Sequence, residues 1–250
     1  MAEAAVHHAQ IMVESGLAEL VPSARRQGAY KLRLNGTDMS YIDLERPQFL
    51  AFYYMRCMAG VIKAYDFVNP PSILHIGGGA MALARHVAIT QPGSKQVVVE
   101  ADRGIIELVA DRLPLPVGAS VEVEHGDARS WVSTRLVERS TDVVIGDVFV
   151  EHDVPEWTAS PAYIEHVRKS LRPRGIYMVN IWDSDPHLGQ MLETLHSTFR
   201  YTCSVVASKG ATSPRNLVVI ASDTAPPYAS IAANVSPFPL RRTLADSAGS

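Results

Sequence analysis

The sequence is poor in the features that mark disulfide-rich, zinc-binding and membrane proteins. It holds two cysteines, Cys57 and Cys203, which lie far apart inside apolar segments, so neither a disulfide framework nor a Cys/His metal cluster is predicted. No apolar run approaches the ~18 residues of a membrane span. The first twenty residues have neither a basic start nor an unbroken apolar stretch, which predicts no secretory signal. We expect a cytoplasmic protein with no metal and no membrane partner.

The chain also lacks a large excess of charge of either sign. Its 23 basic and 26 acidic residues leave a net charge of −3 over 250 residues, so no broad positive field is present to hold a phosphate backbone. Hydrophobic residues make up 47% and charged residues 20%, close to the average of soluble globular proteins. This length and composition predict one large folded domain, or one with a small appendage, and no nucleic-acid partner.

Four segments are expected along the chain. Residues 1–27 form an N-terminal helix, over about residues 4–20, and a linker. Residues 28–45 form a β-hairpin, because two runs that alternate in period two flank Asn35-Gly36, a pair that tolerates positive φ. Residues 46–222 form a Rossmann-like domain. Residues 223–250 turn to Pro, Ala and Ser and are predicted to be a tail on the surface.

Short apolar strands alternate with segments of helix length inside the large domain. The strands are expected at residues 72–76, 96–100, 120–124, 142–147 and 176–181. Because a helix separates each strand from the next, the sheet should be parallel. Two further runs, 201–207 and 216–221, are too close for a crossover helix and should form an antiparallel pair. The fold class is α/β, with a doubly wound, mostly parallel, seven-stranded sheet.

The clearest local motif runs from a strand through Gly77, Gly78 and Gly79 into a helix. Glycines allow a sharp turn and a close approach of the backbone to a ligand, and the free amides of the following helix favour an electronegative group. A nucleotide-like cofactor fits such a loop. The spacing Gly77-x-Gly79-x-x-Ala82, with Glu100 as the ribose acid, also fits a dinucleotide fingerprint, so an NAD-dependent oxidoreductase is one interpretation.

Acidic residues follow three consecutive strands, namely Glu100, Asp127 and Asp147. Ligands of parallel sheets bind at the carboxyl ends of the strands, so these side chains should converge. Glu100 is then placed to accept the ribose hydroxyls and Asp127 the adenine amino group, which leaves Asp147 for the reacting centre. Each acid taken alone is also explained as a helix N-cap or a solvated loop residue.

Residues 72–182 resemble the spermidine synthases and spermidine-synthase-like proteins, the polyamine aminopropyltransferases within the class I S-adenosylmethionine-dependent methyltransferase fold. The resemblance lies in Ile76-Gly-Gly-Gly79, Val97-Val-Val-Glu100, Gly126-Asp-Ala128, the strand end at Asp147 and Leu171-Arg-Pro-Arg-Gly175. It implies that the glycines approach decarboxylated S-adenosylmethionine or S-adenosylmethionine, that Glu100 binds the ribose, and that Asp127 and Ala128 flank the adenine. It also implies that Asp147 orients an amine such as putrescine as the catalytic base, in a homodimer.

Three positions depart from the polar pattern of that family, namely Met39, Ala80 and Val150. In the loop after Asp147, the side chains of His152, Asp153 and Trp157 are candidates to contact the amine substrate instead. Ala80 also removes an acid that would repel the carboxylate of intact S-adenosylmethionine. A small-molecule methyltransferase and a catalytically silent nucleoside-binding scaffold therefore stay open as alternatives.

Overall fold

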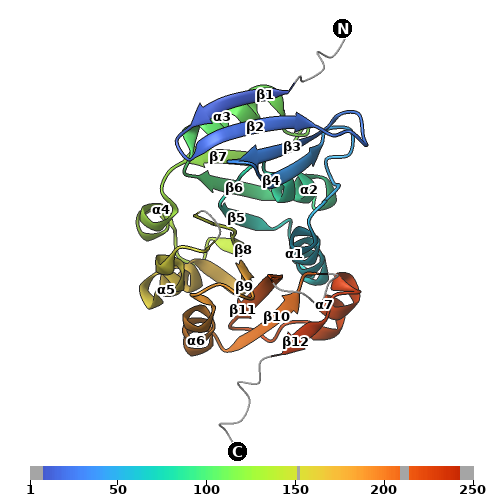
Figure 1. The fold of residues 1–250 in the computed structure, drawn as a ribbon. Coiled ribbons are helices and arrows are strands. Elements are labelled where there is room, and N and C mark those ends of the chain that lie inside the picture. Colours follow the sequence, from blue (N-terminus) through green and yellow to red (C-terminus); the bar gives the residue numbers. More distant parts are fainter. Residues whose placement is uncertain (1–7, 151–152, 209–213, 243–250) are drawn as a thin grey trace, which may run out of the picture.

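The described residues of the computed structural model, 8–150, 153–208 and 214–242, form two β-sheets flanked by helices (Figure 1). The smaller sheet is antiparallel and contains β1 (Ala9–Val13), β2 (Gly16–Pro22), β3 (Ala29–Leu34) and β4 (Thr37–Asp43). It lies at the upper end of the molecule in Figure 1, with β1 against α3 (Arg103–Arg112). The predicted hairpin is confirmed as β3 and β4, whose turn places Asn35 and Gly36 at positive φ.

The predicted N-terminal helix is wrong, because the described part of that segment forms β1 and β2. The two strands turn at Gly16, which has a φ of 130°, a value open to glycine and strained for other residues. The side chain of Asn35 completes the turn: its Oδ1 accepts from Leu17 N at 2.9 Å and its Nδ2 donates to Ser15 O at 3.0 Å. Ala18 and Leu20 are fully buried, so the burial period is two rather than that of a helix.

The larger sheet has the strand order β12-β10-β11-β9-β8-β5-β6-β7. Its strands are β5 (Ser72–Ile76), β6 (Lys95–Glu100), β7 (Val121–His125), β8 (Thr141–Gly146), β9 (Leu171–Trp182), β10 (Tyr201–Val206), β11 (Asn216–Ser222) and β12 (Leu240–Arg242). The strands from β9 through β7 are parallel neighbours, and β11 joins β9 and β10 in antiparallel pairs. The α/β fold with a mostly parallel sheet is confirmed, and the described residues contribute eight strands to this sheet rather than seven.

Helices cover both faces of this sheet. They are α1 (Tyr53–Ala64), α2 (Ala82–Thr90), α3, α4 (Ala128–Arg135), α5 (Pro161–Ser170), α6 (Leu188–Thr198) and α7 (Tyr228–Val235), with a 3-10 turn, η1, at Glu156–Ala159. Val143 packs into the core under α1, α2, α3 and α7, and its neighbour Val144 packs into the core under α4, α5 and α6. The alternation explains why the parallel strands read as unbroken apolar runs.

The predicted surface tail is also wrong over residues 223–242, which form α7 and β12. Ile231 and Val235 of α7 are buried, and the helix packs on α1. Gly60 of α1 allows this approach, since a Cβ at that position would lie 2.7 Å from Asn234 O. β12 adds a strand beside β10. Apolar side chains at a helical spacing therefore hold this segment on the domain despite its prolines.

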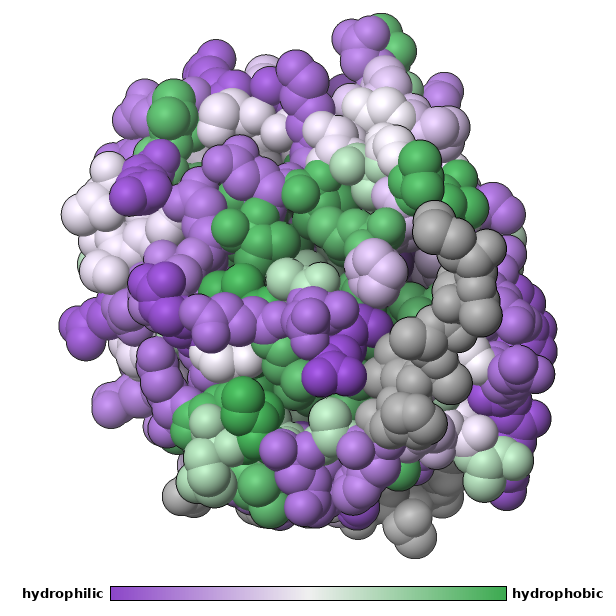
Figure 2. All heavy atoms as spheres, turned by 90° about the horizontal axis from the view of Figure 1, so that it is seen from above, coloured by the Kyte–Doolittle hydropathy of each residue, from purple (hydrophilic) through white to green (hydrophobic). Residues whose placement is uncertain are grey.

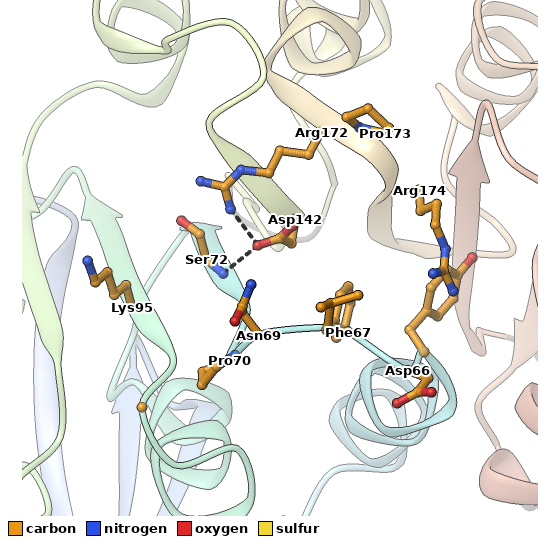
Figure 3. Close-up of a pocket in the computed structure, with 13 residues that line it drawn as sticks. Asp66, Phe67, Asn69, Pro70, Ser72, Lys95, Asp142, Arg172, Pro173 and Arg174 are labelled. Atoms are coloured by element: carbon orange, nitrogen blue, oxygen red, sulfur yellow. Dashed lines mark hydrogen bonds and ion pairs between the residues drawn. The ribbon is translucent and has the colours of Figure 1, made fainter.

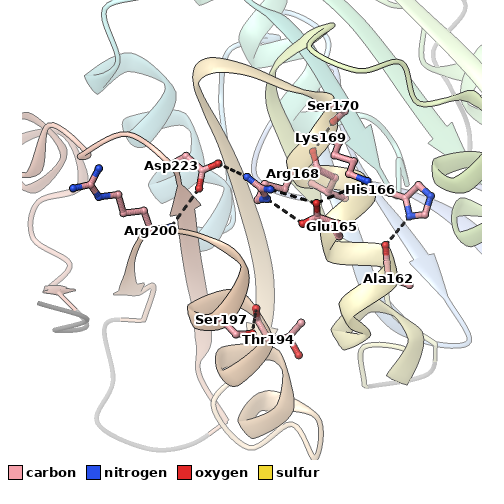
Figure 4. A network of polar contacts seen from close by, with 11 residues as sticks. Ala162, Glu165, His166, Arg168, Lys169, Ser170, Thr194, Ser197, Arg200 and Asp223 are labelled. Carbon is pink, nitrogen blue, oxygen red and sulfur yellow. Dashed lines mark hydrogen bonds and ion pairs between the residues drawn. The ribbon is translucent and has the colours of Figure 1, made fainter. Parts of the chain in front are cut away.

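A polar network joins α5 to the turn after β11 on the other face of the sheet (Figure 4). Arg168 donates to Glu165 Oε2 at 3.0 Å and to Asp223 Oδ2 at 2.8 Å. The backbone of Arg200 donates to the other oxygen of Asp223 at 3.3 Å. These contacts fix the end of β11 against the start of β10. None of the helices in the described part of the chain has the length and apolar character that a membrane crossing requires.

Candidate active site

The glycine loop after β5 is pressed against the end of β8. Gly77 has a φ of 91°, and a Cβ there would collide with the carbonyl oxygen of Asp147. Asp147 N donates to Ile76 O at 2.8 Å, and Gly77 N donates to Val99 O at 3.0 Å. Only glycine fits this position, because both the φ and the space exclude a side chain. The loop thereby brings the start of α2 close to the residue that follows β8.

Glu100 closes the glycine loop from the neighbouring strand. Its Oε2 accepts from Gly78 N and from Gly79 N, each at 2.9 Å, and its Oε1 accepts from Asp102 N at 3.1 Å. A carboxylate offers about four acceptor positions, so Oε1 keeps one for a further donor. The acid expected to bind ribose thus also shapes the loop expected to approach the cofactor.

Asp127 begins α4, and its Oδ1 accepts from Ser130 N at 2.9 Å. This is the N-cap role that its position in the sequence also allowed. The side chain is exposed, and the next residue, Ala128, is buried. Glu100 is the last residue of β6, and Asp127 and Asp147 follow the ends of β7 and β8. These three strands share one sheet, with β5 between β6 and β8. All three acids therefore lie at the carboxyl edge of the parallel strands.

Two side chains from distant elements hold the Asp147 carboxylate. The hydroxyl of Tyr54 in α1 donates to Oδ2 at 3.0 Å, and Nδ2 of Asn180 in β9 donates to Oδ1 at 2.8 Å. Asn180 is buried, and its own Oδ1 accepts from Asn216 Nδ2 of β11 at 3.0 Å. Because Asn216 occupies the amide oxygen, the amide nitrogen of Asn180 faces Asp147. Each carboxylate oxygen therefore has one fixed donor.

The surroundings of Asp147 favour a carboxylate with enhanced basicity. Burial raises its pKa above the ordinary value, and the hydrogen bonds from Asn180 and Tyr54 oppose that rise. Burial, together with the nearby charge of Asp147, raises the pKa of Tyr54 well above its usual range, so Tyr54 stays a hydroxyl donor at neutral pH. Tyr54 and Asn180 thus keep the Asp147 carboxylate ionised and oriented, and burial leaves it able to accept a proton.

A small cavity of about 20 Å³ lies between Asp147, Gly77, Gly78 and His75, which is space for about one water molecule. Burial lowers the pKa of His75 to about 4, so its imidazole is neutral, and it shares a hydrogen bond of 2.8 Å with Gln96. His75 is therefore a buried core residue whose side chain has a hydrogen-bond partner. In the ranges that the structure describes, no group of three or more His, Cys, Asp or Glu suits a metal ion.

Comparison with known families identifies this architecture. Residues 51–225 match the family described as spermine/spermidine synthase domain. The chain belongs to the spermine/spermidine synthase family. Within this family, a polyamine aminopropyltransferase of Chromobacterium violaceum is 27% identical over 164 residues, and one of Neisseria meningitidis is 26% identical over 191 residues. These matches cover 65% and 76% of this chain but only 61% and 70% of the two relatives.

Solved structures agree with the family assignment. A probable spermidine synthase from Corynebacterium glutamicum superposes with a TM-score of 0.85 at 25% identity, over 95% of this chain and 91% of that one. Human methyltransferase-like protein 13, solved in complex with SAH, gives a TM-score of 0.60 at 15% identity, over 73% of this chain and 90% of that one. At that identity the likeness concerns the fold alone, and it places this spermine/spermidine synthase domain on a methyltransferase-like scaffold.

The candidate substrate residues are less well gathered than the cofactor loop. Asp153 is exposed and pairs through its backbone with Val150. Trp157 lies in η1, half-buried, with its ring edge-on to Tyr163 at 5.0 Å between centroids. His152 lies outside the described residues. The contacts of Asp153 and Trp157 are thus with their own segment and α5, and none of them joins the Asp147 carboxylate.

The three departures from the family pattern have different surroundings. Ala80 is fully buried, and its N donates to Ser40 Oγ of β4 at 3.2 Å. Met39 is half-buried against the core, whereas Val150 is 64% exposed. The N-terminal sheet therefore reaches the cofactor loop through Ser40, the neighbour of Met39. Only Ala80 replaces a side chain inside the loop itself.

Sequence reasoning missed Tyr54 and Asn180 as site residues. Tyr54 lies in a segment whose apolar residues recur at helical spacing, which by itself indicates core packing, and Asn180 interrupts an apolar strand. The available signal was the polar atom that each carries into a buried segment, because buried tyrosine hydroxyls and amides require partners.

Proposed function

We propose that this chain transfers an aminopropyl group from decarboxylated S-adenosylmethionine to a small diamine such as putrescine. The observation that carries the proposal is the Asp147 carboxylate, oriented by Tyr54 and Asn180 beside the glycine loop in a member of the spermine/spermidine synthase family. The curated relatives are polyamine aminopropyltransferases. A spermidine synthase with 16% identity was solved with the transition-state analogue AdoDATO.

In this mechanism Asp147 orients the amine and accepts its proton. The cofactor supplies a carbon next to a sulfonium. A bond forms from the amine nitrogen to that carbon, the carbon–sulfur bond breaks, and the electron pair leaves with the neutral thioether, 5'-methylthioadenosine. The departing thioether needs no acid, so one base is sufficient. Tyr54 and Asn180 keep the carboxylate in a fixed direction, which reduces the entropy lost on reaching the reactive geometry.

The cofactor-binding roles follow from the same edge of the sheet. In the proposal, Gly77, Gly78 and Gly79 allow the backbone to approach the cofactor, and Glu100 accepts a ribose hydroxyl at Oε1. Asp127 and Ala128 flank the adenine. The support is that Glu100 retains an acceptor position and that Asp127 is exposed at the adjacent strand end. The loop after Asp147, with His152, Asp153 and Trp157, contributes the contacts to the amine substrate.

The proposal includes a homodimer in a reducing compartment. β1 is an edge strand of the described part of the N-terminal sheet, with Ile11 44% and Met12 72% exposed. Apolar side chains gather towards the middle of the upper face of the molecule within a polar surround (Figure 2). An antiparallel pair of β1 edges obeys two-fold symmetry. Both cysteines are buried, and no disulfide joins them in the described residues, which suits a cytoplasmic protein. Light scattering of a Met12→Glu variant tests this interface. If the variant remains dimeric, the dimer does not form through β1.

A specific observation favours methyl transfer as a second candidate. Arg85 is 1% exposed, and its guanidinium donates to Ala80 O at 3.0 Å and Pro114 O at 2.7 Å, as well as to Leu113 O. Burial lowers its pKa to about 10, so it is a cation at neutral pH. Its positive charge lies next to Ala80, and within the described residues the guanidinium donates to backbone carbonyl oxygens and forms no ion pair with a carboxylate. Such a charge favours the carboxylate of intact S-adenosylmethionine over a cationic tail.

A thermal-shift titration with both forms of the cofactor separates these functions. A ligand at a hundred times its dissociation constant adds about 2.7 kcal/mol of stability. The proposal predicts a larger shift with decarboxylated S-adenosylmethionine than with S-adenosylmethionine at equal concentrations. The opposite order assigns methyl transfer. If neither form of the cofactor raises the melting temperature, the chain is a silent scaffold. A rise in melting temperature with NAD alone points to an oxidoreductase.

A further inference from the structure

A second cavity, of about 530 Å³, lies at the amino ends of the parallel strands (Figure 3), whereas Asp147 lies at their carboxyl ends. Ser72, Lys95 and Asp142 reach it from the amino ends of β5, β6 and β8, and the segments 65–70 and 172–174 complete its wall. Asp142 lies at the start of β8 and Asp147 directly after its end, five positions further on, so the two sites are separated by roughly 16 Å. The volume lies within the range of about 300 to 1,000 Å³ that is common for small-molecule sites.

The charges around this cavity are unequal. Three basic side chains line it, Lys95, Arg172 and Arg174, against two acidic ones, Asp66 and Asp142. The carboxylate of Asp142 is already engaged, because its Oδ2 accepts from Ser72 N at 2.8 Å and from Arg172 Nη1 at 2.7 Å. Lys95 and Arg174 form no ion pair within the described ranges. Asp66 forms no ion pair there either, so two cations and one carboxylate remain unpaired and their net charge is positive.

The backbone places one of these cations at a strained position. Arg174 has a φ of 71°, a left-handed conformation that residues other than glycine adopt at a cost of about 1 kcal/mol or more. It follows Pro173 and precedes Gly175, where a Cβ would lie 2.9 Å from Arg172 O. This irregular start of β9, where its register with β8 shifts, therefore has a fixed shape. In Figure 3 the Arg174 side chain extends from β9 towards the end of α1, where Asp66 lies.

The remaining wall of the cavity is apolar and aromatic. The rings of Tyr65 and Phe67 stack with their centroids 5.9 Å apart, and Pro70 and Pro173 line the same space. Figure 3 shows Lys95 and Arg174 on opposite sides of this wall, with Asn69 and Phe67 between them. Flat apolar surfaces between unpaired cations suit a ligand that combines an apolar body with an anionic group.

We propose that this cavity binds a small organic anion, a carboxylate or a phosphate with an apolar body, whose anionic group contacts either Lys95 or Arg174. Such a ligand has the opposite charge to the diamine proposed for the Asp147 site, so the cavity is a separate binding site and not an extension of the substrate site. The proposal does not depend on the activity of the Asp147 site.

Isothermal titration calorimetry with matched aromatic probes tests this site. Benzoate and phenyl phosphate carry the two anionic groups, benzyl alcohol is the neutral control and benzylamine is the cationic control. We expect saturable binding of at least one anion below about 5 mM, with the stronger of the two identifying the group preferred. Binding should weaken as salt is added, because the cations are exposed.

The double variant Lys95→Gln/Arg174→Gln should weaken anion binding at least tenfold, and Lys63→Gln, an exposed cation of α1 outside the cavity, should leave it unchanged. Unchanged binding of 5'-methylthioadenosine shows that the double variant is folded. If the unmodified chain does not bind that ligand, an unchanged melting temperature of the double variant serves as the folding control. The proposal is overturned if neither anion binds, if benzylamine binds as tightly as the anions, or if the double variant binds them as well as the unmodified chain.

Discussion

Tyr54 and Asp147, 93 residues apart in the chain, meet through a hydrogen bond of 3.0 Å from the tyrosine hydroxyl to Oδ2 of the carboxylate. α1 brings the first residue to the carboxyl edge of the sheet, and β8 delivers the second. With Asn180 on the other oxygen, this contact converts an acid at a strand end into a base with a fixed direction.

Removal of one donor should shift the acidic limb of the pH–rate profile. Asp147 must be ionised to accept a proton, and the hydrogen bonds from Asn180 and Tyr54 lower a pKa that burial raises. Asn180→Ala and Tyr54→Phe should therefore raise that pKa further and move the acidic limb of kcat/KM to higher pH. Asn234→Ala, in α7, is the matched control. If the acidic limb lies at the same pH in all three variants, the ionisation of Asp147 does not set that limb and Asp147 is not the base in the rate-determining step.

Glu100→Ala should weaken nucleoside binding, because it removes the acceptor of two loop amides as well as the proposed ribose ligand. Loss of hydrogen bonds to a charged group costs about 1.5–3 kcal/mol, or roughly tenfold to a hundredfold in affinity. Calorimetry with 5'-methylthioadenosine measures the change, and Glu122→Ala, exposed on β7, is the control. Equal affinity in both variants would show that the ribose lies elsewhere.

The N-terminal sheet should stabilise the domain through Asp102. Ser15 donates to Asp102 Oδ2 twice, from its backbone N at 2.7 Å and from its side-chain Oγ, the bond that alanine removes, and Ile105 N donates to Oδ1 at 3.1 Å. Burial raises the pKa of Asp102, but these hydrogen bonds outweigh it and the net pKa is lowered. A lowered pKa gives stability that is present above the ordinary pKa of aspartate and is lost as the pH falls through the folded value.

Ser15→Ala should therefore lower the free energy of unfolding at pH 7 by about 1 kcal/mol. The difference in this free energy from the unmodified chain should shrink below pH ~4. Chemical denaturation at several pH values measures both effects. A difference that stays constant down to pH ~2 would mean that Ser15 acts by packing alone.

Two glycines in helices should respond to alanine with opposite signs. A Cβ on Gly60 would lie 2.7 Å from Asn234 O, whereas a Cβ on Gly189 of α6 meets nothing within 4 Å. Gly189→Ala should stabilise the chain by up to about 1 kcal/mol through helix propensity. Gly60→Ala should destabilise it by about 1–3 kcal/mol, because α7 must shift away from α1. Thermal melts compare the two, and equal stabilisation of both would contradict the packing of α7 on α1.

The parallel sheet was predictable because its strands are buried on both faces and helices separate them at regular intervals. The glycine loop and the acids at strand ends follow from the same logic, since Gly77, Glu100 and Asp147 each occupy a strand terminus. The N-terminal strands were not predictable in this way. Their turn depends on the side chain of Asn35, which is distant in sequence, and a short segment with mixed apolar spacing fits a helix as well as a strand.

The failure over residues 223–242 has a similar physical cause. Proline-rich composition predicts a surface tail, but Ile231, Val235 and Phe238 are buried and anchor the segment on α1. The contacts of Asp147 were hidden for another reason. Tyr54 and Asn180 lie in segments whose apolar pattern dominates the local signal, and only tertiary structure brings their polar atoms to one carboxylate.

The most direct test of the central claim is the formation of 5'-methylthioadenosine from decarboxylated S-adenosylmethionine and putrescine, measured for the unmodified chain and for Asp147→Asn. The account predicts release of 5'-methylthioadenosine with the unmodified chain. It predicts a rate lowered at least a hundredfold in Asp147→Asn, with cofactor affinity within a few fold of the original. No release from the unmodified chain, or full activity in Asp147→Asn, would contradict it.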